Sequence, residues 1–322
     1  MSRHAEPLQT HHLHGTTPDL DALVALHRFA PRCSLRARRP SGSPLSGEWR
    51  TRQRGRGIDF DQVRAYQPGD DIRSIDWRVT ARRQAPHTKL YREERERPVL
   101  LAADLRSPMF FGSRVCYKSV QVAALSALLG WIALAGRDRV GGMVFGDHDH
   151  QDIRPKRSRH AVLALIQQLH AYATRLTTPC PAGPIAPFSQ LLEQLLRTAH
   201  TGAGLYILSD FHDLNGDSEQ LLFQLARHND VTLIQVHDPL ELQLPQQRSL
   251  WVSDGQQRVN LQDLPDLARQ QQQRDQALRQ LCQRLGLPLH PIATDDSPVS
   301  SLQRLFGRTP FQRAASIPGG AV

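Results

Sequence analysis

The sequence predicts an α/β fold: a doubly wound, mostly parallel sheet, preceded by a smaller basic subdomain that contains β-structure. Three observations support this prediction. From about residue 98 onward, short apolar runs alternate with longer stretches of helical periodicity, which is typical of βαβ units. Two of these runs, VLLAAD and GLYILSD, are largely apolar and end in an acid, as expected of central strands with both faces covered. Upstream of residue 97 the alternation is absent and arginine is abundant.

These patterns divide the chain into parts of different character. Both ends are polar or loosely patterned, so they are predicted to be flexible. The expected parts are a tail over residues 1–17, an N-terminal helix and basic signature subdomain over 18–96, the α/β domain over 97–307, and a tail over 308–322.

Each element is predicted from its local pattern. The N-terminal helix, residues 18–30, has Thr17 as its N-cap and Pro18 in its first turn. Further along, apolar runs predict strands and apolar residues at helical spacing predict helices. Asp254 and Gly255 form a strong hairpin-turn signal between β-prone runs. The expected strands are 99–104, 138–147, 202–210, 230–238 and 287–294, the helices 117–136, 158–176, 188–200, 218–229, 266–285 and 297–307, and the hairpin 248–261.

The composition excludes several classes of protein. With 322 residues, of which 39% are hydrophobic and 22% charged, the chain is globular rather than disordered. Four cysteines lie far apart without a C-x-x-C pair, which disfavours zinc ribbons and disulfide scaffolds. The start lacks an apolar leader, and the most apolar stretch, residues 120–136, is shorter than the roughly 20 residues of a membrane helix. We therefore expect a cytoplasmic protein without a transmembrane segment, and peripheral membrane contact stays open.

Positive charge is concentrated in one segment. Residues 28–92 contain 16 Lys and Arg against 6 Asp and Glu, whereas the whole chain has a net charge of +9. Such a segment could bind phosphate groups or an acidic protein surface, or it could be a solvated surface. Nucleic acid is a disfavoured partner because no zinc finger, aromatic-rich strand or recognition helix accompanies the charge.

Two acids are predicted to meet at one edge of the sheet. Asp104 and Asp210 each follow a buried strand, and functional crevices of open α/β sheets lie at the carboxyl ends of the strands. Such a pair would suit Mg²⁺, Ca²⁺ or Mn²⁺. Alternatively, each acid caps the helix or loop that follows its strand.

Two weaker signals have simpler interpretations. The run GDHDHQD, residues 146–152, has side chains that bind metals, but neighbouring residues on an extended segment point to opposite sides. It is predicted to be a solvated turn. Cys116, next to the long apolar helix, is predicted to be a buried structural thiol.

One long motif resembles a known family. The segments GRGIDFDQVRAYQPGDDIRSIDWRVTARR, DLRSPMFFGS and KSVQVAALSALLGWIALAGRDRVGGMVF occur in this order. Together they resemble the bacterial domain-of-unknown-function-58 family. The resemblance implies a von Willebrand factor type A-like α/β domain preceded by the first segment, and a functional association with MoxR-type AAA+ ATPases.

The first segment contains an alternating set of charges around a tryptophan. We predict that these side chains form an ion-pair lattice, because buried acids and arginines must pair with one another. A catalytic carboxylate cluster is the alternative. Asp70 is expected to cap a short helix whose residues Ile72, Ile75 and Val79 face inward. The predicted lattice comprises Arg64, Gly69, Asp70, Asp71, Arg73, Asp76, Trp77 and Arg82.

The resemblance also implies a cation site, and the sequence departs from it. Type A domains bind a divalent cation through D-x-S-x-S, a Thr and a later Asp. Asp104 and Asp210 match the acids, but the two serine positions hold Arg106 and Pro108, and the loop GPIAPFSQLL offers Ser189 instead of Thr. We therefore predict a degenerate site, in which Arg106 pairs with Asp104 or Asp210 in place of the metal. No cofactor is expected; Mg²⁺ or Mn²⁺ is the ion that an intact site would bind.

These observations predict a non-enzymatic protein–protein interaction module. The family resemblance implies that it acts with a MoxR-type AAA+ ATPase in assembling or remodelling a client protein. No nucleophile elbow, zinc-protease or dinucleotide motif is present to suggest an enzyme. The alternatives are a metal-dependent adhesion or hydrolase domain that uses Asp104 and Asp210, and a basic binder of nucleic acid or anionic membranes. The oligomeric state is not predicted. The expected partner-binding crevice consists of Asp104, Arg106, Pro108, Phe110, Phe111 and Asp210.

Overall fold

A computed structural model describes most of the chain and divides it into two compact units. One unit comprises residues 1–39 and 97–322, and the other comprises residues 40–96. The described residues are 13–35, 58–67, 72–83, 85–93, 97–175, 184–242, 251–253, 258–260 and 267–307.

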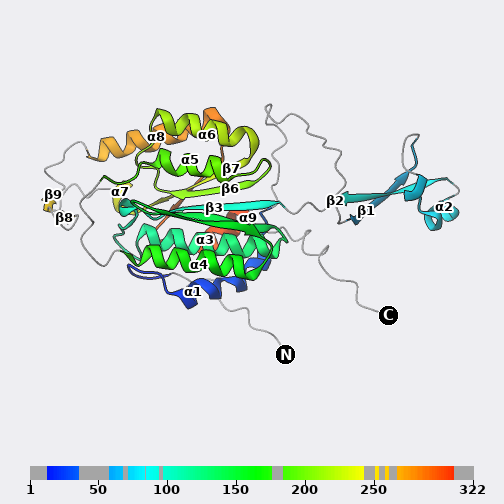
Figure 1. Ribbon diagram of the computed structural model, residues 1–322, viewed down its shortest axis with the longest axis horizontal. Coiled ribbons are helices and arrows are strands. Elements are labelled where there is room, and N and C mark those ends of the chain that lie inside the picture. The colour runs from blue at the N-terminus through cyan, green and yellow to red at the C-terminus, as the bar shows by residue number, and fades with distance from the viewer. Residues whose placement is uncertain are drawn as a thin grey trace. The chain divides into compact units, whose positions relative to one another are not determined.

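The larger unit is built on a six-stranded sheet (Figure 1). The strand order is β10-β7-β6-β3-β4-β5, and all neighbours are parallel except β4 and β5. Counted along the chain from β3, this is the order 3-2-1-4-5-6 of doubly wound α/β sheets. The predicted fold class is confirmed. The strands are β3 (Pro98–Asp104), β4 (Arg139–Phe145), β5 (His150–Lys156), β6 (Gly204–Ser209), β7 (Asp230–His237) and β10 (Leu289–Ala293).

Helices cover both faces of this sheet, and a separate hydrophobic cluster lies under each layer (Figure 1). One layer contains α1 (Leu20–Ala25), the 3₁₀ helix η1 (Leu26–Arg32), α3 (Lys118–Ala135), α4 (Arg159–Ala173) and α9 (Pro298–Phe306). The other contains α5 (Phe188–Thr198), α6 (Gly216–His228) and α8 (Leu267–Leu285). Smaller elements are η3 (Ser107–Met109), α7 (Pro239–Leu242) and the predicted hairpin, whose strands are β8 (Trp251–Ser253) and β9 (Arg258–Asn260).

Helix α3 is the central helix of its layer. It contacts β3, α4, α9 and η1, and nearly all of its residues are buried. Among the residues that the structure describes, it is the one helix long and apolar enough to cross a membrane, but 89% of it is buried inside the protein. Its apolar character is thus explained by packing on all sides, as expected of a buried core helix.

The chain divides differently from the prediction at its N-terminal side. Residues 18–35 were expected to belong to the basic subdomain, but they pack in the larger unit, where Leu23, Leu26 and Ala30 are buried against α3. An apolar helix face needs a partner, and the long core helix provides one. The helix also starts later than expected, because Asp19 rather than Thr17 accepts hydrogen bonds from its first N–H groups.

Strand β5 is absent from the predicted elements. The turn expected at residues 146–152 ends at Asp149, and the chain then pairs with β4 from His150 to Lys156. An edge strand with polar side chains on both faces lacks the apolar run by which strands are recognised. Asp147, in the turn itself, accepts hydrogen bonds from the backbone N–H of Ser107, at 2.7 Å, and from its hydroxyl.

The smaller unit contains an antiparallel pair of strands, β1 (Ile58–Ala65) and β2 (His87–Glu93). Between them lie the 3₁₀ helix η2 (Ile72–Ser74) and the helix α2 (Trp77–Arg83). The β-containing subdomain is thus observed, although its strands were not located from the sequence.

The signature residues of this unit differ from the prediction in two respects. Asp76 caps α2, because its Oδ1 accepts from the N–H groups of Arg78 and Val79 at 3.0 and 3.2 Å. The cap was expected at Asp70. Ile72, expected to face inward, is 66% exposed, and Trp77 is 68% exposed. The ion-pair lattice stays a prediction, since Gly69, Asp70 and Asp71 lie outside the described residues.

Candidate functional site

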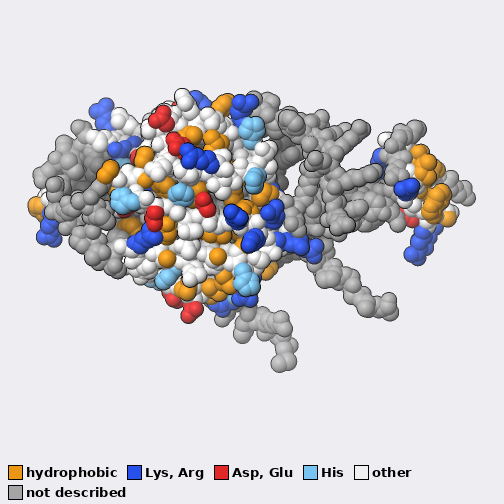
Figure 2. All heavy atoms as spheres, in the orientation of Figure 1, with side chains coloured by type: hydrophobic (Ala, Val, Ile, Leu, Met, Phe, Trp, Pro, Cys, Tyr) orange, Lys and Arg blue, Asp and Glu red, His pale blue; other side chains and the backbone are white. Residues whose placement is uncertain are grey.

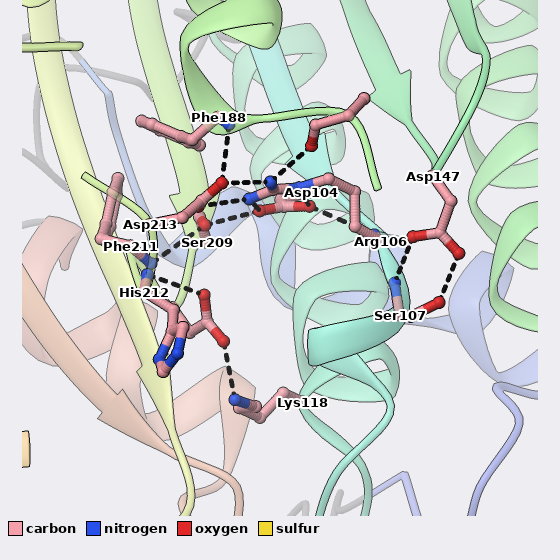
Figure 3. Close-up of polar contacts among 12 residues, drawn as sticks. Asp104, Arg106, Ser107, Lys118, Asp147, Phe188, Ser209, Phe211, His212 and Asp213 are labelled. Carbon is pink, nitrogen blue, oxygen red and sulfur yellow. Dashed lines mark hydrogen bonds and ion pairs between the residues drawn. The ribbon is translucent and has the colours of Figure 1, made fainter. Parts of the chain in front are cut away.

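The candidate site lies where the adjacent parallel strands β3 and β6 end (Figure 3). The chain leaves β3 for a helix on one face of the sheet and leaves β6 for a helix on the other (Figure 1). Ligand crevices of doubly wound sheets form at this switch point. Asp104 is the last residue of β3 and Ser209 the last of β6. Polar side chains from distant parts of the sequence therefore meet here.

The guanidinium group of Arg106 lies at the centre of the site. Its Nε and Nη2 donate to the two carboxylate oxygens of Asp104 at 2.9 and 2.8 Å. On the other side, Nη1 and Nη2 donate to the carboxylate of Asp213 at 2.7 and 3.0 Å. Nη1 also donates to the backbone carbonyl of Ala186 at 2.8 Å. One cation thus joins the end of β3, the segment before α5 and the loop after β6 (Figure 3).

These ion pairs are largely removed from water. The side chains of Arg106 and Asp104 are 3% and 1% exposed, and the rings of Phe145 and Phe188 lie close to the guanidinium. Burial alone would lower the pKa of Arg106, but its hydrogen bonds to Asp104 and Asp213 outweigh this effect and raise the pKa. Burial would raise the pKa of Asp213, but Arg106 lowers it below its ordinary value. Arg106 is therefore a permanent cation.

A second buried cation, Lys118, begins helix α3. Its Nζ donates to Asp210 at 2.8 Å and to Glu241 of α7 at 2.7 Å, and its side chain is 3% exposed. Burial would lower the pKa of Lys118, but the two carboxylate charges raise it. The pKa of Asp210 is lowered in turn by Lys118, against the effect of its own burial. Asp104 and Asp210 therefore pair with two different cations, Arg106 and Lys118.

The turn after β6 has a strained backbone that positions Asp213. Ser209 donates its hydroxyl to Asp104 at 2.7 Å and accepts from the N–H of Phe211 at 3.0 Å. Phe211 has a φ of 54°, a left-handed conformation that costs a residue other than glycine about 1 kcal/mol or more. Its ring packs edge-on against Phe188 at 5.4 Å. These contacts hold the turn in the conformation that faces Asp213 towards Arg106.

Comparison with known proteins assigns the chain to a family. Residues 62–280 match the family model described as "Protein of unknown function DUF58". The chain belongs to the DUF58 family. It is similar to uncharacterized proteins of Mycobacterium tuberculosis and Mycobacterium bovis, each 28% identical over 207 residues. The match covers 64% of this chain and only 63% of the length of those relatives.

Two solved structures are similar to this DUF58 chain. One is a conserved hypothetical protein BatB from Bacteroides thetaiotaomicron, with a TM-score of 0.42 and 10% identity, covering 69% of this chain and 100% of that one. The other is a von Willebrand factor type A protein from Catenulispora acidiphila, with a TM-score of 0.29 and 13% identity, covering 47% of this chain and 35% of that one. The fold class itself is established by the strand order of the sheet.

The residues of the predicted contact crevice lie at different depths in this DUF58 chain. Asp104 and Arg106 are 0% and 3% exposed, so they form the floor beneath the surface. Their charges are satisfied by each other and by Asp213, so neither residue reaches the surface of the chain, and the contact crevice as a whole stays a prediction. Asp210 is also nearly buried, with 8% of its side chain exposed. Pro108 is exposed, and Phe110 and Phe111 are half-buried.

Two members of the site were missed in the sequence. Arg106 pairs with Asp104, one of its two expected partners, and it also pairs with Asp213, which was not predicted. Asp213 stands three residues after Asp210, and this second acid was a usable signal. Lys118 is the one charged residue of the expected helix 117–136. Because lysine is almost never buried without a partner, its position in an otherwise uncharged helix already indicated a paired carboxylate.

The pair between Arg106 and Asp213 predicts an acid-sensitive contribution to stability. The lowered pKa of Asp213 means that this contribution is present above the ordinary carboxyl pKa of about 4 and is lost as the pH falls through the lowered value. Asp213→Asn is therefore expected to melt below the wild type at neutral pH, and the difference should narrow below about pH 4. Thermal melts over this range measure it, and a difference that widens on acidification would contradict the prediction.

Cys116 is expected to be unreactive in the folded protein. Burial, followed by the charges of Asp238 and Asp295, raises the pKa of its thiol to about 12. Because the thiolate is the reactive form, iodoacetamide should modify Cys116 at neutral pH only after unfolding. Mass spectrometry of the peptide that contains Cys116, with and without denaturant, tests this. Equal rates of labelling in both conditions would show that the thiol is accessible in the native state.

Proposed function

We propose that this chain is a non-catalytic protein-interaction module that works in the cytoplasm with a MoxR-type AAA+ ATPase to assemble or remodel a client protein. The ATPase partner is inferred from the family resemblance alone. The interaction role is supported by the geometry of the candidate site. The observation that carries it is the buried guanidinium of Arg106, which is held by the carboxylates of Asp104 and Asp213 at the switch point of the sheet.

A degenerate cation site is part of this proposal. A divalent cation of the Mg²⁺ or Ca²⁺ type requires about six or more oxygen ligands. Here the carboxylates of Asp104 and Asp213 are engaged by guanidinium nitrogens, and Pro108 has no side-chain oxygen. Among the described residues, no group of three or more His, Cys, Asp and Glu side chains is arranged to hold a metal ion. These residues do not fit a divalent ion, and Arg106 supplies a fixed positive charge in its place.

The same arrangement favours recognition over catalysis. Arg106 and Lys118 both have raised pKa values and stay protonated, so neither serves as a general base at neutral pH. Asp104 and Asp210 are held in ion pairs beneath the surface. A partner would instead contact the loops that follow the carboxyl ends of β3, β6 and β7 and lie above these buried ion pairs. We call these loops the rim. Among the exposed side chains of this rim are Pro108, Arg114 and Leu242.

The proposed partnership is tested with a purified MoxR-type ATPase in a pull-down, without nucleotide, with ADP and with a non-hydrolysable ATP analogue. We expect association that depends on the nucleotide and is lost in the double variant R114E/L242D, because Arg114 and Leu242 are 62% and 41% exposed on the rim. The matched control is R227E/F223D on α6, away from the rim. Absence of binding in every nucleotide state would remove the ATPase from the proposal.

Calorimetric titration with Mg²⁺ and Mn²⁺ tests the degenerate cation site. We expect no saturable heat, because the guanidinium of Arg106 already occupies the oxygens of both carboxylates. Saturable binding that disappears in Asp104→Ala would show that the site holds a cation after all. It would then favour the alternative of a metal-dependent adhesion or hydrolase domain.

A further inference from the structure

The outer edge of β5 is an open strand edge in the part of the chain that the structure describes. β5 is the last strand of the sheet and pairs with β4. On β4, the backbone carbonyl of Phe145 accepts from Leu105 at 2.7 Å and thus points towards β3. In an antiparallel ladder, its β5 partner His150 then directs its backbone groups away from β4, and so does Asp152 two residues later. Outward-directed backbone groups of this kind can pair with another strand.

A hollow of about 560 Å³ lies beside this edge, between β5 and the start of α4. Its lining includes Ile153, Arg154, Lys156 and His160, and Asp152 is the one acidic residue among the lining side chains. Arg154, Lys156 and His160 are exposed. Three further exposed arginines lie nearby. Two of them follow Lys156 in the chain, Arg157 and Arg159, and the third, Arg139, is at the start of the neighbouring strand β4. Figure 2 shows Lys and Arg side chains gathered on the right-hand side of the larger unit, on the face that is drawn.

We propose that an extended acidic segment of a partner protein binds here by adding a further strand to β5. Its backbone would pair with the outward groups of His150 and Asp152, and alternate side chains would enter the hollow. Its carboxylates would face Arg154 and Lys156. Asp152, the one acidic residue of the lining, would disfavour a carboxylate placed beside it. This surface goes beyond the proposed function, because none of its residues belongs to the rim at the carboxyl ends of β3 and β6.

Two observations favour a peptide over a nucleic acid as the occupant. The lining of the hollow contains no Phe, Tyr or Trp side chain, so it lacks the large rings on which bases stack most strongly. An open strand edge also presents backbone donors and acceptors at the spacing of another polypeptide strand. The positive charge alone would attract an acidic peptide or a nucleic acid equally well. The open strand edge favours the peptide.

The experiment measures fluorescence anisotropy of a labelled peptide of alternating glutamate and valine, titrated with the full chain. Three further probes are a peptide with lysine in place of glutamate, the acidic peptide with alternate backbone nitrogens methylated, and a short DNA duplex. The variant is R154E/K156E, with R154Q/K156Q as a milder version in case charge reversal affects folding. The matched control, R197E/R227E, reverses two exposed charges on α5 and α6.

We expect the acidic peptide to bind and the lysine peptide not to bind. R154E/K156E should weaken binding on the order of tenfold, because two attractions become repulsions, and R197E/R227E should leave it unchanged. Backbone methylation should abolish binding, since it removes donors that strand addition requires. Equal binding of the methylated peptide would overturn the proposal. So would binding that is insensitive to both variants, or tighter binding of the duplex through the same two residues.

Discussion

Replacing Arg106 with alanine is expected to destabilise the α/β unit by about 3–5 kcal/mol, the cost of removing one partner from a buried ion pair. The substitution leaves Asp104, which is 0% exposed, next to Asp213 without the intervening cation. It also removes the hydrogen bond that joins the site to the carbonyl of Ala186. The midpoint of urea unfolding, followed by circular dichroism, measures the loss. Arg114→Ala, which disrupts an exposed pair with Asp295, is the control and should cost at most about 1 kcal/mol.

A related variant asks whether Arg106 stands in for a cation. Arg106→Ser removes the guanidinium and adds a hydroxyl ligand two residues after Asp104. Mg²⁺ is then expected to raise the melting temperature of Arg106→Ser but not that of the wild type, because ligands that bind only the folded state stabilise it. This interpretation of the site would be contradicted if Arg106→Ala lost less stability than the control Arg114→Ala. It would also be contradicted if Mg²⁺ stabilised the wild type and Arg106→Ser equally.

Lys118→Met is expected to have an effect of similar size, about 3–5 kcal/mol. The methionine fills the space of the lysine stem but leaves Asp210 and Glu241 facing each other without a cation. Combining Lys118→Met with Asp210→Asn should restore part of the loss, because the unpaired buried charge is then removed. A double-mutant cycle of unfolding free energies gives the coupling between the two residues.

The pH dependence of Lys118→Met provides an independent check. In the wild type, Lys118 holds the pKa of Asp210 down, so the stability of this pair is lost as the pH falls below about 4. Without the lysine, burial raises the pKa of Asp210, and the variant should gain relative stability on acidification. If the changes in unfolding free energy of the two single variants add up to that of the double variant, Lys118 and Asp210 are not coupled. The same conclusion would follow if the stabilities of the wild type and of Lys118→Met depended on pH in the same way.

Much of the fold could be predicted from the sequence because its central elements have strong local patterns. β3, β6 and α3 are apolar runs of the right length, bounded by turns and charges, and the structure contains all three. β5 could not be found this way, because this edge strand has no apolar run of its own and forms by pairing with β4. The assignment of residues 18–35 failed for a similar reason: an amphipathic helix indicates that it packs on something, but not on which unit.

The candidate site was predictable in its chemistry but not in its pairing. The substitution of Arg106 and Pro108 at the expected ligand positions is visible in the sequence and correctly directed attention to a guanidinium beside Asp104. Arg106 pairs with Asp213 and not with Asp210 because the chain makes a left-handed turn at Phe211. Such turns are usually predicted from a glycine, and this position has none. The pairing of Lys118 with Asp210 depends on how α3 lies against β6, which is a property of the assembled sheet.

The sequence separation of these partners has a kinetic consequence. Arg106 is 107 residues from Asp213 and 80 from Ala186, so the contacts close very long loops. Contacts of this kind are expected to form after the sheet has assembled, and they are then absent from the transition state for folding. Their removal should leave the refolding rate nearly unchanged and accelerate unfolding instead. The buried arginine would thus set the lifetime of the native protein rather than the speed at which it is reached.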